Sequence, residues 1–329
     1  MLSRRHFSKP TFLLLPLVFA AVWPAPADVR IAAGQESASI EISGEPFATL
    51  QFGKQTGRPF LHPLRTASGK IITRGPQSGT QGSVPLPAGL WMGHARVNGV
   101  DYWEAAPGAH PNHKAGSVVF REITKIEQGV DRGSIWLTAD WIDPDGAAVV
   151  TEKRTMAFSA GPEDSRIIDI DCRLEPRQRV LIGDSTNGIL GLRLAAPFEE
   201  INGGRPRTFT GDAGSDGVTG KRSPWLDYMT IMQRERIGVL IMDHPRNHNF
   251  PTRWKVRTEA SIIATPFAEL DYYNAPPLKG PAPKTARDAG VTLEKGETLR
   301  FRYRIVIHPS TLDIDQAWRD FCEFNWDRR

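Results

Sequence analysis

The alternation of short apolar segments with tight turns is the feature that most constrains the fold of this chain. Ile135, Leu137, Ala139 and Trp141 share one face of a strand pattern, and a second such stretch covers residues 149–158. Between them lies Asp143-Pro144-Asp145-Gly146, in which proline and glycine favour a turn. The two stretches therefore predict an antiparallel hairpin.

The same pattern recurs along most of the chain. A second hairpin is predicted where 291–293 and 298–308 flank the turn at 294–297. Further strands are predicted at 39–42, 48–52, 71–73, 118–126, 166–174, 190–194, 237–242 and 254–265. Strands do not alternate with helices, which argues against a parallel doubly wound fold. We predict an all-β fold, a large antiparallel β-sandwich.

One helix is predicted, near the C-terminus. Asp313 is a suitable N-cap, with Gln316 three residues later as its capping-box partner. Apolar residues then follow at helical spacing: Ile314, Ala317, Trp318, Phe321 and Cys322. We expect this helix to pack on the outside of a sheet. The spacing also places Cys322, and Cys172 on a strand, toward the core, so we expect buried thiols rather than a disulfide.

The first 27 residues are typical of an export leader. The run Ser3-Arg4-Arg5-His6-Phe7-Ser8-Lys9 matches the twin-arginine pattern, and an apolar stretch and Ala25-Pro26-Ala27 follow it. An uncleaved anchor is the alternative. We expect a signal peptide over 1–27, a single β-sandwich domain over 28–329, and a periplasmic or secreted protein.

Charge argues against a nucleic-acid partner. The chain has 41 basic and 37 acidic residues, and the leader would remove Arg4, Arg5 and Lys9, which leaves 38 against 37. No dense basic run remains, and no second apolar segment reaches spanning length. We expect a small-molecule or oligosaccharide ligand, no nucleic acid, and no membrane association after leader removal.

The densest group of reactive side chains lies at 243–254, directly after the apolar run 237–242. Loops held by a rigid scaffold often carry chemistry, although a structural corner is the alternative. We expect His244 and Asp227 to exchange protons with a ligand, assisted by His94. Residues expected to bind the ligand are Arg65, Trp91, Asp243, Asn247, Arg253 and Trp254.

Three of these binding residues also have a structural interpretation. Arg253 offers a planar fork for a ligand, but an ion pair with Asp243 or Asp227 would occupy the same fork. Trp91 and Trp254 offer flat apolar faces of the kind that stack on sugar rings, and core packing is their alternative.

A metal site is the less favoured interpretation of the histidines. His244 and His248 are four residues apart, and His110 and His113 add two more. Two prolines within 243–254 argue against the helix that would align the first pair. We expect no cofactor. Nucleophilic catalysis is not indicated either, because no Gly-x-Ser-x-Gly sequence occurs.

Several stretches, in order, resemble a bacterial family of unknown function that is often labelled "methane oxygenase PmoA". They include Gly89-Leu90-Trp91-Met92-Gly93-His94, Asp140-Trp141-Ile142-Asp143-Pro144-Asp145-Gly146, Trp225-Leu226-Asp227-Tyr228, and Asp243-His244-Pro245 through Pro251-Thr252-Arg253-Trp254. The resemblance runs from about residue 47 to 308. The resemblance implies a galactose-mutarotase-like β-supersandwich and carbohydrate chemistry or binding. It favours Asp243, His244, Arg253 and Trp254 as site residues and leaves His248 incidental. A membrane oxygenase subunit would need spanning helices that this sequence lacks.

The chain departs from that family pattern at 83–88, where Ser-Val-Pro-Leu-Pro-Ala replaces a histidine-rich run. The resulting hypothesis is an exported protein that acts on a carbohydrate by epimerase- or lyase-like acid–base chemistry. The alternatives are a non-catalytic glycan-binding module and, less favoured, a metal-dependent oxygenase or hydrolase.

Overall fold

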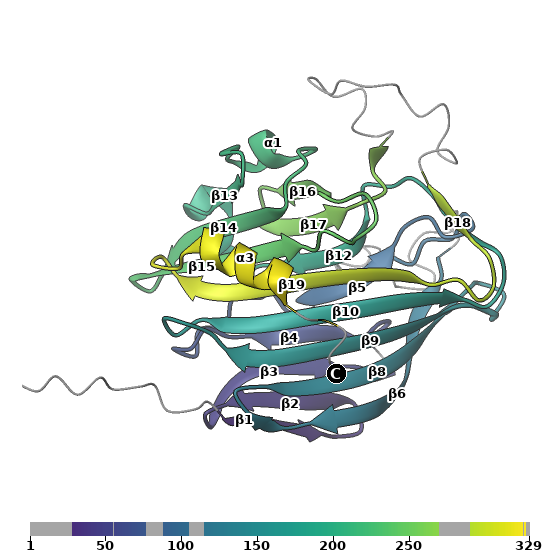
Figure 1. The fold of residues 1–329 in the computed structure, drawn as a ribbon, viewed down its shortest axis with the longest axis horizontal. Coiled ribbons are helices and arrows are strands. Elements are labelled where there is room, and N and C mark those ends of the chain that lie inside the picture. The colour runs from purple at the N-terminus through teal and green to yellow at the C-terminus, as the bar shows by residue number, and fades with distance from the viewer. Residues whose placement is uncertain are drawn as a thin grey trace, which may run out of the picture.

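Two large antiparallel sheets face each other in the computed structural model (Figure 1). The structure describes residues 28–54, 56–76, 88–104, 115–269, 290–324 and 326. The leader 1–27, the positions 83–87, and His110 and His113 lie outside the described residues. The predicted all-β sandwich is confirmed.

The nine-stranded sheet has the order β16-β17-β12-β5-β4-β3-β2-β1-β7. Its strands are β1 (Asp28–Ala33), β2 (Ser37–Ile42), β3 (Glu45–Gln51), β4 (Phe60–Leu64), β5 (Leu90–His94), β7 (Gly129–Val130), β12 (Gly188–Arg193), β16 (Arg253–Arg257) and β17 (Ser261–Thr265). The predicted strand 254–265 is therefore two strands, because the chain turns at 258–260, where Ala260 has a φ of 58°. The predicted strand 71–73 forms only isolated bridges.

The eight-stranded sheet has the order β13-β14-β15-β19-β10-β9-β8-β6. Its strands are β6 (Ser117–Glu127), β8 (Gly133–Ile142), β9 (Ala148–Ala160), β10 (Arg166–Pro176), β13 (Arg205–Thr208), β14 (Trp225–Met232), β15 (Glu235–Asp243) and β19 (Leu299–Pro309). Strands β8 and β9 are the hairpin that the sequence predicts, with Ile135 opposite Met156. A small sheet pairs β11 (Val180–Ile182) with β18 (Val291–Leu293).

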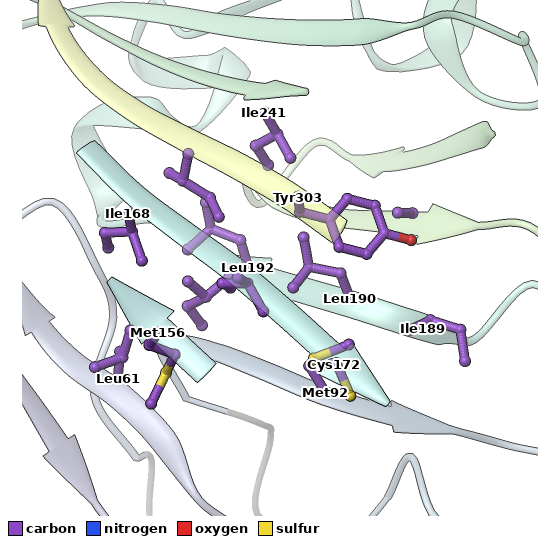
Figure 2. Packing of buried hydrophobic residues seen from close by; sticks show 14 of the residues in the cluster. Leu61, Met92, Met156, Ile168, Cys172, Ile189, Leu190, Leu192, Ile241 and Tyr303 are labelled. Atoms are coloured by element: carbon purple, nitrogen blue, oxygen red, sulfur yellow. The ribbon is translucent and has the colours of Figure 1, made fainter. Parts of the chain in front are cut away.

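The core fills the space between the two sheets, because alternate side chains of each strand point inward. Figure 2 shows Met92 and Leu190 of the nine-stranded sheet close to Cys172 and Tyr303 of the other. Each fully buried aliphatic side chain contributes roughly 1.5–3 kcal/mol. Cys172 is buried here, as predicted.

The helix α3 (Ile314–Glu323) covers part of the outer face of the eight-stranded sheet (Figure 1). Asp313 accepts a hydrogen bond from the Gln316 backbone N–H at 2.9 Å, as the capping pattern predicts. Phe321 packs on Leu240, Met242 and Val306, which confirms that the helix lies on the outside of a sheet. The prediction of a buried Cys322 is wrong: the thiol is exposed, because the buried side of the helix is centred on the preceding residue.

The outer face beside α3 carries ion pairs. Arg300 bonds Asp171, and Arg304 bonds both oxygens of Asp169 at 2.7 and 3.0 Å. Short helical turns complete the described elements: α1 (Ser215–Val218), η1 (Ala196–Phe198) and η2 (Glu200–Asn202). Within the described ranges, no helix has both the length and the apolar character needed to cross a bilayer.

Candidate functional site

Five strands of the nine-stranded sheet begin or finish at the same end of the sheet, which we name the polar end. Strand β5 finishes at His94, which lies opposite Gly188 at the start of β12. Strand β17 finishes at Thr265, opposite Arg253 at the start of β16, and β4 begins beside β5. Antiparallel pairing thus brings together side chains that are far apart in the sequence.

His94 is a fully buried, neutral imidazole at this end. Its Nε2 lies 2.8 Å from the Gly183 carbonyl oxygen, so Nε2 carries the proton and donates it. Nδ1 is then an acceptor, and it has no hydrogen-bond partner. Burial lowers the pKa of His94 to about 4. A Cβ on Gly188 would lie 2.4 Å from Nδ1, so only glycine fits beside this ring.

Phe267 connects His94 to a second imidazole. The His94 ring meets Phe267 edge-on, with centroids 5.3 Å apart, and the His248 ring stacks on Phe267 at 4.9 Å. His248 is half-buried, and burial lowers its pKa. His248, which the resemblance leaves incidental, thus lies at the polar end, which its ring reaches from the loop after β15 of the other sheet.

The loop that carries His248 is fixed by two of the predicted binding residues. Asp243 accepts hydrogen bonds from Asn247 Nδ2 at 2.7 Å and from the Thr252 N–H at 2.8 Å. Asn247 also bonds the backbone carbonyl and N–H of Arg302 at 2.7 and 2.8 Å. Burial raises the pKa of Asp243 to about 7. Asp243 and Asn247 thus shape the loop with atoms that are already engaged.

Glu269 is held by two arginines at the polar end. Arg253 donates to Glu269 Oε2 at 3.1 Å, and Arg222 donates to the other carboxylate oxygen. The Glu269 backbone N–H donates to Asp184 Oδ1 at 2.6 Å. Arg253 therefore forms an ion pair, as its structural alternative proposes, but its partner is Glu269 rather than Asp243 or Asp227.

Arg58 is a buried cation beside β5. Its side chain is 5% exposed, and neither Nη1 nor Nη2 has a hydrogen-bond partner. Burial lowers its pKa to about 9, although the nearby Asp101 carboxylate opposes that shift. A Cβ on Gly93 would lie 3.0 Å from Nη1, which places the guanidinium next to the strand that finishes at His94. The hydroxyl of Tyr102, whose N–H bonds the His94 carbonyl oxygen, is also without a partner.

The expected acid–base pair lies elsewhere, on the outer face of the eight-stranded sheet. Asp227 is fully buried and accepts from Arg207 Nε at 3.0 Å and from His308 Nε2 at 3.1 Å. Asp227 lies opposite Leu240 of β15, and His244 follows Leu240 by four residues, just after the end of that strand, roughly 13 Å away at the usual rise per residue. The structure does not bring these two side chains together with His94.

His244 packs beneath the C-terminal helix. Its ring meets Phe321 and Trp326 edge-on, at 5.5 and 5.7 Å, and its Nδ1 accepts from the Arg246 N–H at 3.1 Å. Burial, followed by the charge of Arg302, lowers the pKa of His244 to about 4. The imidazole is therefore neutral and enclosed by aromatic rings.

The remaining predicted binding residues have no open face at the polar end. Trp254 is fully buried, and its Nε1 donates to the Ser223 carbonyl oxygen at 2.9 Å. Trp91 is 2% exposed and packs on Trp103 with centroids 4.9 Å apart. Arg65 donates to the Gly69 carbonyl oxygen at 3.3 Å in a surface turn. Both tryptophans are therefore packed in the interior, which is the structural alternative to ligand binding.

Sequence patterns gave no sign of Arg58 or Glu269, since neither lies in a dense polar stretch or at a recognisable spacing. Only their place beside strand ends could have drawn attention to them. No group of three or more His, Cys, Asp or Glu side chains among the described residues is arranged to hold a metal ion.

Comparisons with known proteins identify a family but no activity. Among solved structures, the chain is similar to a variant of a Glycoside Hydrolase Family 97 enzyme from Pseudoalteromonas sp. strain K8, with 8% identity and a TM-score of 0.35 over 89% of this chain. That match spans only 36% of the hydrolase. A GalM/aldose epimerase homologue from C. elegans matches with 9% identity and a TM-score of 0.32, over 88% of this chain and 100% of the homologue. These likenesses are too distant to assign an activity.

No curated protein matches the chain. A family model described as "Family of unknown function (DUF6807)" matches residues 37–321, and its description does not carry the methane oxygenase label. Because the match covers most of the sequence, this chain belongs to the DUF6807 family.

Proposed function

We propose that this protein binds a carbohydrate at the polar end and acts on it by acid–base chemistry of an epimerase- or lyase-like kind. The observation that supports this proposal most is a set of buried polar atoms without hydrogen-bond partners: Arg58 Nη1 and Nη2, His94 Nδ1, Tyr102 Oη and Arg253 Nε. An unsatisfied buried atom costs roughly 1–3 kcal/mol. Proteins keep such atoms where a ligand or water completes the bonds.

The chemistry of these atoms matches a polyhydroxylated ligand. Sugar hydroxyls both donate and accept hydrogen bonds, so they can bond to donors such as those of Arg58 and to acceptors such as His94 Nδ1. Glu269, which two arginines hold, offers a further carboxylate acceptor. We assign proton transfer to His248 rather than to His244 and Asp227, because His248 is partly exposed while the other two are buried among protein partners.

A non-catalytic glycan-binding module is the second candidate function. It is favoured by the two ion pairs of Glu269, which already engage both carboxylate oxygens with protein partners. The two functions differ in what His248 does. Catalysis requires its ring nitrogens, whereas binding alone requires the donors of Arg58.

Turnover and binding measured on one panel separate these functions. The panel contains aldoses, uronic acids and their disaccharides, with product formation followed by NMR and binding by calorimetry. We expect Arg58→Gln to weaken binding by about tenfold or more, since it removes charged hydrogen bonds. His248→Gln should abolish turnover with binding retained. Turnover that survives His248→Gln refutes the acid–base role, and the exposed Arg205→Gln is the control.

We further propose that residues 1–27 direct export by the twin-arginine route and that 28–329 is one domain. Cell fractionation of the full chain, with Arg4 and Arg5 both replaced by lysine as the comparison, tests export. An unchanged distribution after the replacement would contradict the twin-arginine route. Limited proteolysis that yields two stable halves would contradict one domain.

A further inference from the structure

Two segments at the polar end meet across the sandwich. One is the loop after β15 of the eight-stranded sheet, and the other is the segment 266–269, which follows β17 of the nine-stranded sheet. Asn249 Nδ2 donates to the Pro266 carbonyl oxygen at 2.8 Å, and this bond joins the sequence neighbours of the stacked His248 and Phe267 rings. The position of His248 therefore depends on how the two segments are held together.

Arg222 bonds both segments. Its Nη1 donates to the backbone carbonyl oxygens of Asn249 at 2.8 Å and of Pro251 at 2.7 Å. Its Nη2 donates to one carboxylate oxygen of Glu269, whose other oxygen accepts from Arg253. One planar guanidinium thus ties the loop after β15 to a carboxylate that follows the other sheet.

The backbone of the loop depends on such bonds from outside it. Asn249 has a φ of 56°, in the left-handed region that asparagine adopts more readily than most residues. A residue keeps this conformation where the surrounding structure fixes it. The Arg222 side chain is 32% exposed, so its hydrogen bonds compete less with water than they would at an open surface.

We propose that Arg222 is a positioning residue for His248, which it holds stacked on Phe267 and close to Glu269. A guanidinium suits this role, because its rigid fork of donors can bond two carbonyl oxygens and a carboxylate at the same time. The catalytic meaning of this role rests on the proposed function, which assigns proton transfer to His248. The position of the His248 ring itself can be measured without a ligand.

The proton affinity of His248 reports its position. Burial lowers the pKa of His248, and the negative charge of Glu269 opposes that effect. Loss of Arg222 would release the loop and expose the imidazole, and it would also remove a positive charge that neutralises Glu269. Both changes favour the imidazolium, so both raise the pKa of His248.

NMR titration of protein with isotope-labelled histidine tests the proposal, and the spectrum of His248→Gln identifies the His248 signal. In the wild type, the His248 ring protons should show the upfield ring-current shift caused by the stacked Phe267. In Arg222→Ala that shift should shrink, and the pKa of His248 should rise toward 6.5. Arg222→Lys should change both in the same direction, because an ammonium group keeps the charge but lacks the planar fork.

Lys70→Ala is the matched control. Lys70, between β4 and β5, forms an ion pair with Glu235 at the start of β15, whereas the loop lies beyond the end of that strand. This variant should leave the His248 titration unchanged. Circular dichroism checks that each variant is folded, and Arg222→Lys carries the test if Arg222→Ala does not fold.

An unchanged His248 titration in Arg222→Ala, a wild-type titration in Arg222→Lys, or an equal shift in Lys70→Ala overturns the positioning role. Turnover that survives His248→Gln refutes the acid–base role instead, and it leaves the effect of Arg222 on the titration in place. The two failures are therefore distinguishable.

Discussion

Replacing Asp243 with asparagine should make the stability of the protein less dependent on pH. Asp243 lies at the base of the loop that carries His248 and is 1% exposed. Burial raises its pKa from 3.8 to about 7, against the opposing effects of the Asn247 and Thr252 hydrogen bonds and of the Arg222 charge. The folded chain therefore favours the protonated carboxyl group more than the unfolded chain does.

The size and sign of this effect follow from linkage between protonation and folding. A pKa difference of one pH unit corresponds to about 1.4 kcal/mol, so a rise from 3.8 to about 7 corresponds to roughly 4 kcal/mol. Because the pKa of the folded state is the higher one, this stability is fully present below about pH 4. It is lost as the pH rises to about 7, and the loss is then constant.

Urea unfolding of the wild type and of Asp243→Asn at pH 5, 6, 7 and 8 measures the effect. Other titrating groups cancel in the difference between the two proteins. From pH 5 to pH 8 that difference should move by about 2.5 kcal/mol in favour of the variant. The asparagine side chain would place its own N–H group opposite one of the two donors, Asn247 or Thr252, that bond Asp243. A loss of stability that is the same at every pH is therefore also expected. A difference that is the same at all four pH values would refute the reasoning.

Three further substitutions test the packing. Gly188→Ala should lower the free energy of unfolding by more than about 2 kcal/mol, because the new Cβ would lie 2.4 Å from the His94 ring nitrogen. Gly217→Ala, whose Cβ would have nothing within 4 Å, should lower it by less than about 0.5 kcal/mol. Urea unfolding measures both changes. Trp254→Ala should cost about 3–5 kcal/mol, and an unchanged thermal midpoint would contradict its core position. Asp169→Ala should lower the free energy of unfolding by about 3–5 kcal/mol, because it leaves the buried Arg304 without its partner. Adding Arg304→Met to this variant should restore stability. If it does not, the buried charge is not the cause of the loss.

Local patterns account for most of the fold that could be predicted from this sequence. The hairpin of β8 and β9 follows from period-two alternation and a turn sequence, and the start of α3 follows from the Asp313 cap. Both depend on residues close together in the chain. The break at 258–260 carries no glycine or proline, so nothing in that local pattern separates β16 from β17.

The polar end could not be predicted, because its residues come from segments that only sheet pairing brings together. The register places His94 opposite Gly188 and Arg253 opposite Thr265, pairs that are many residues apart. The dense segment 243–254 pointed to this region, but His248 rather than His244 reaches it. Asp243 was predicted to bind the ligand because it lies in this dense polar segment. In the structure its carboxylate accepts hydrogen bonds from Asn247 and Thr252 and fixes the loop.

A ligand that bonds the buried donors of Arg58 is the central claim, and saturation-transfer NMR tests it most directly. The same panel of aldoses, uronic acids and disaccharides would be applied to the wild type, to Arg58→Gln and to the exposed Arg205→Gln. We predict saturation transfer to at least one sugar with the wild type and with Arg205→Gln, and a strongly reduced transfer at the same sugar concentration with Arg58→Gln. Equal transfer in all three proteins, or none with the wild type, would contradict the account.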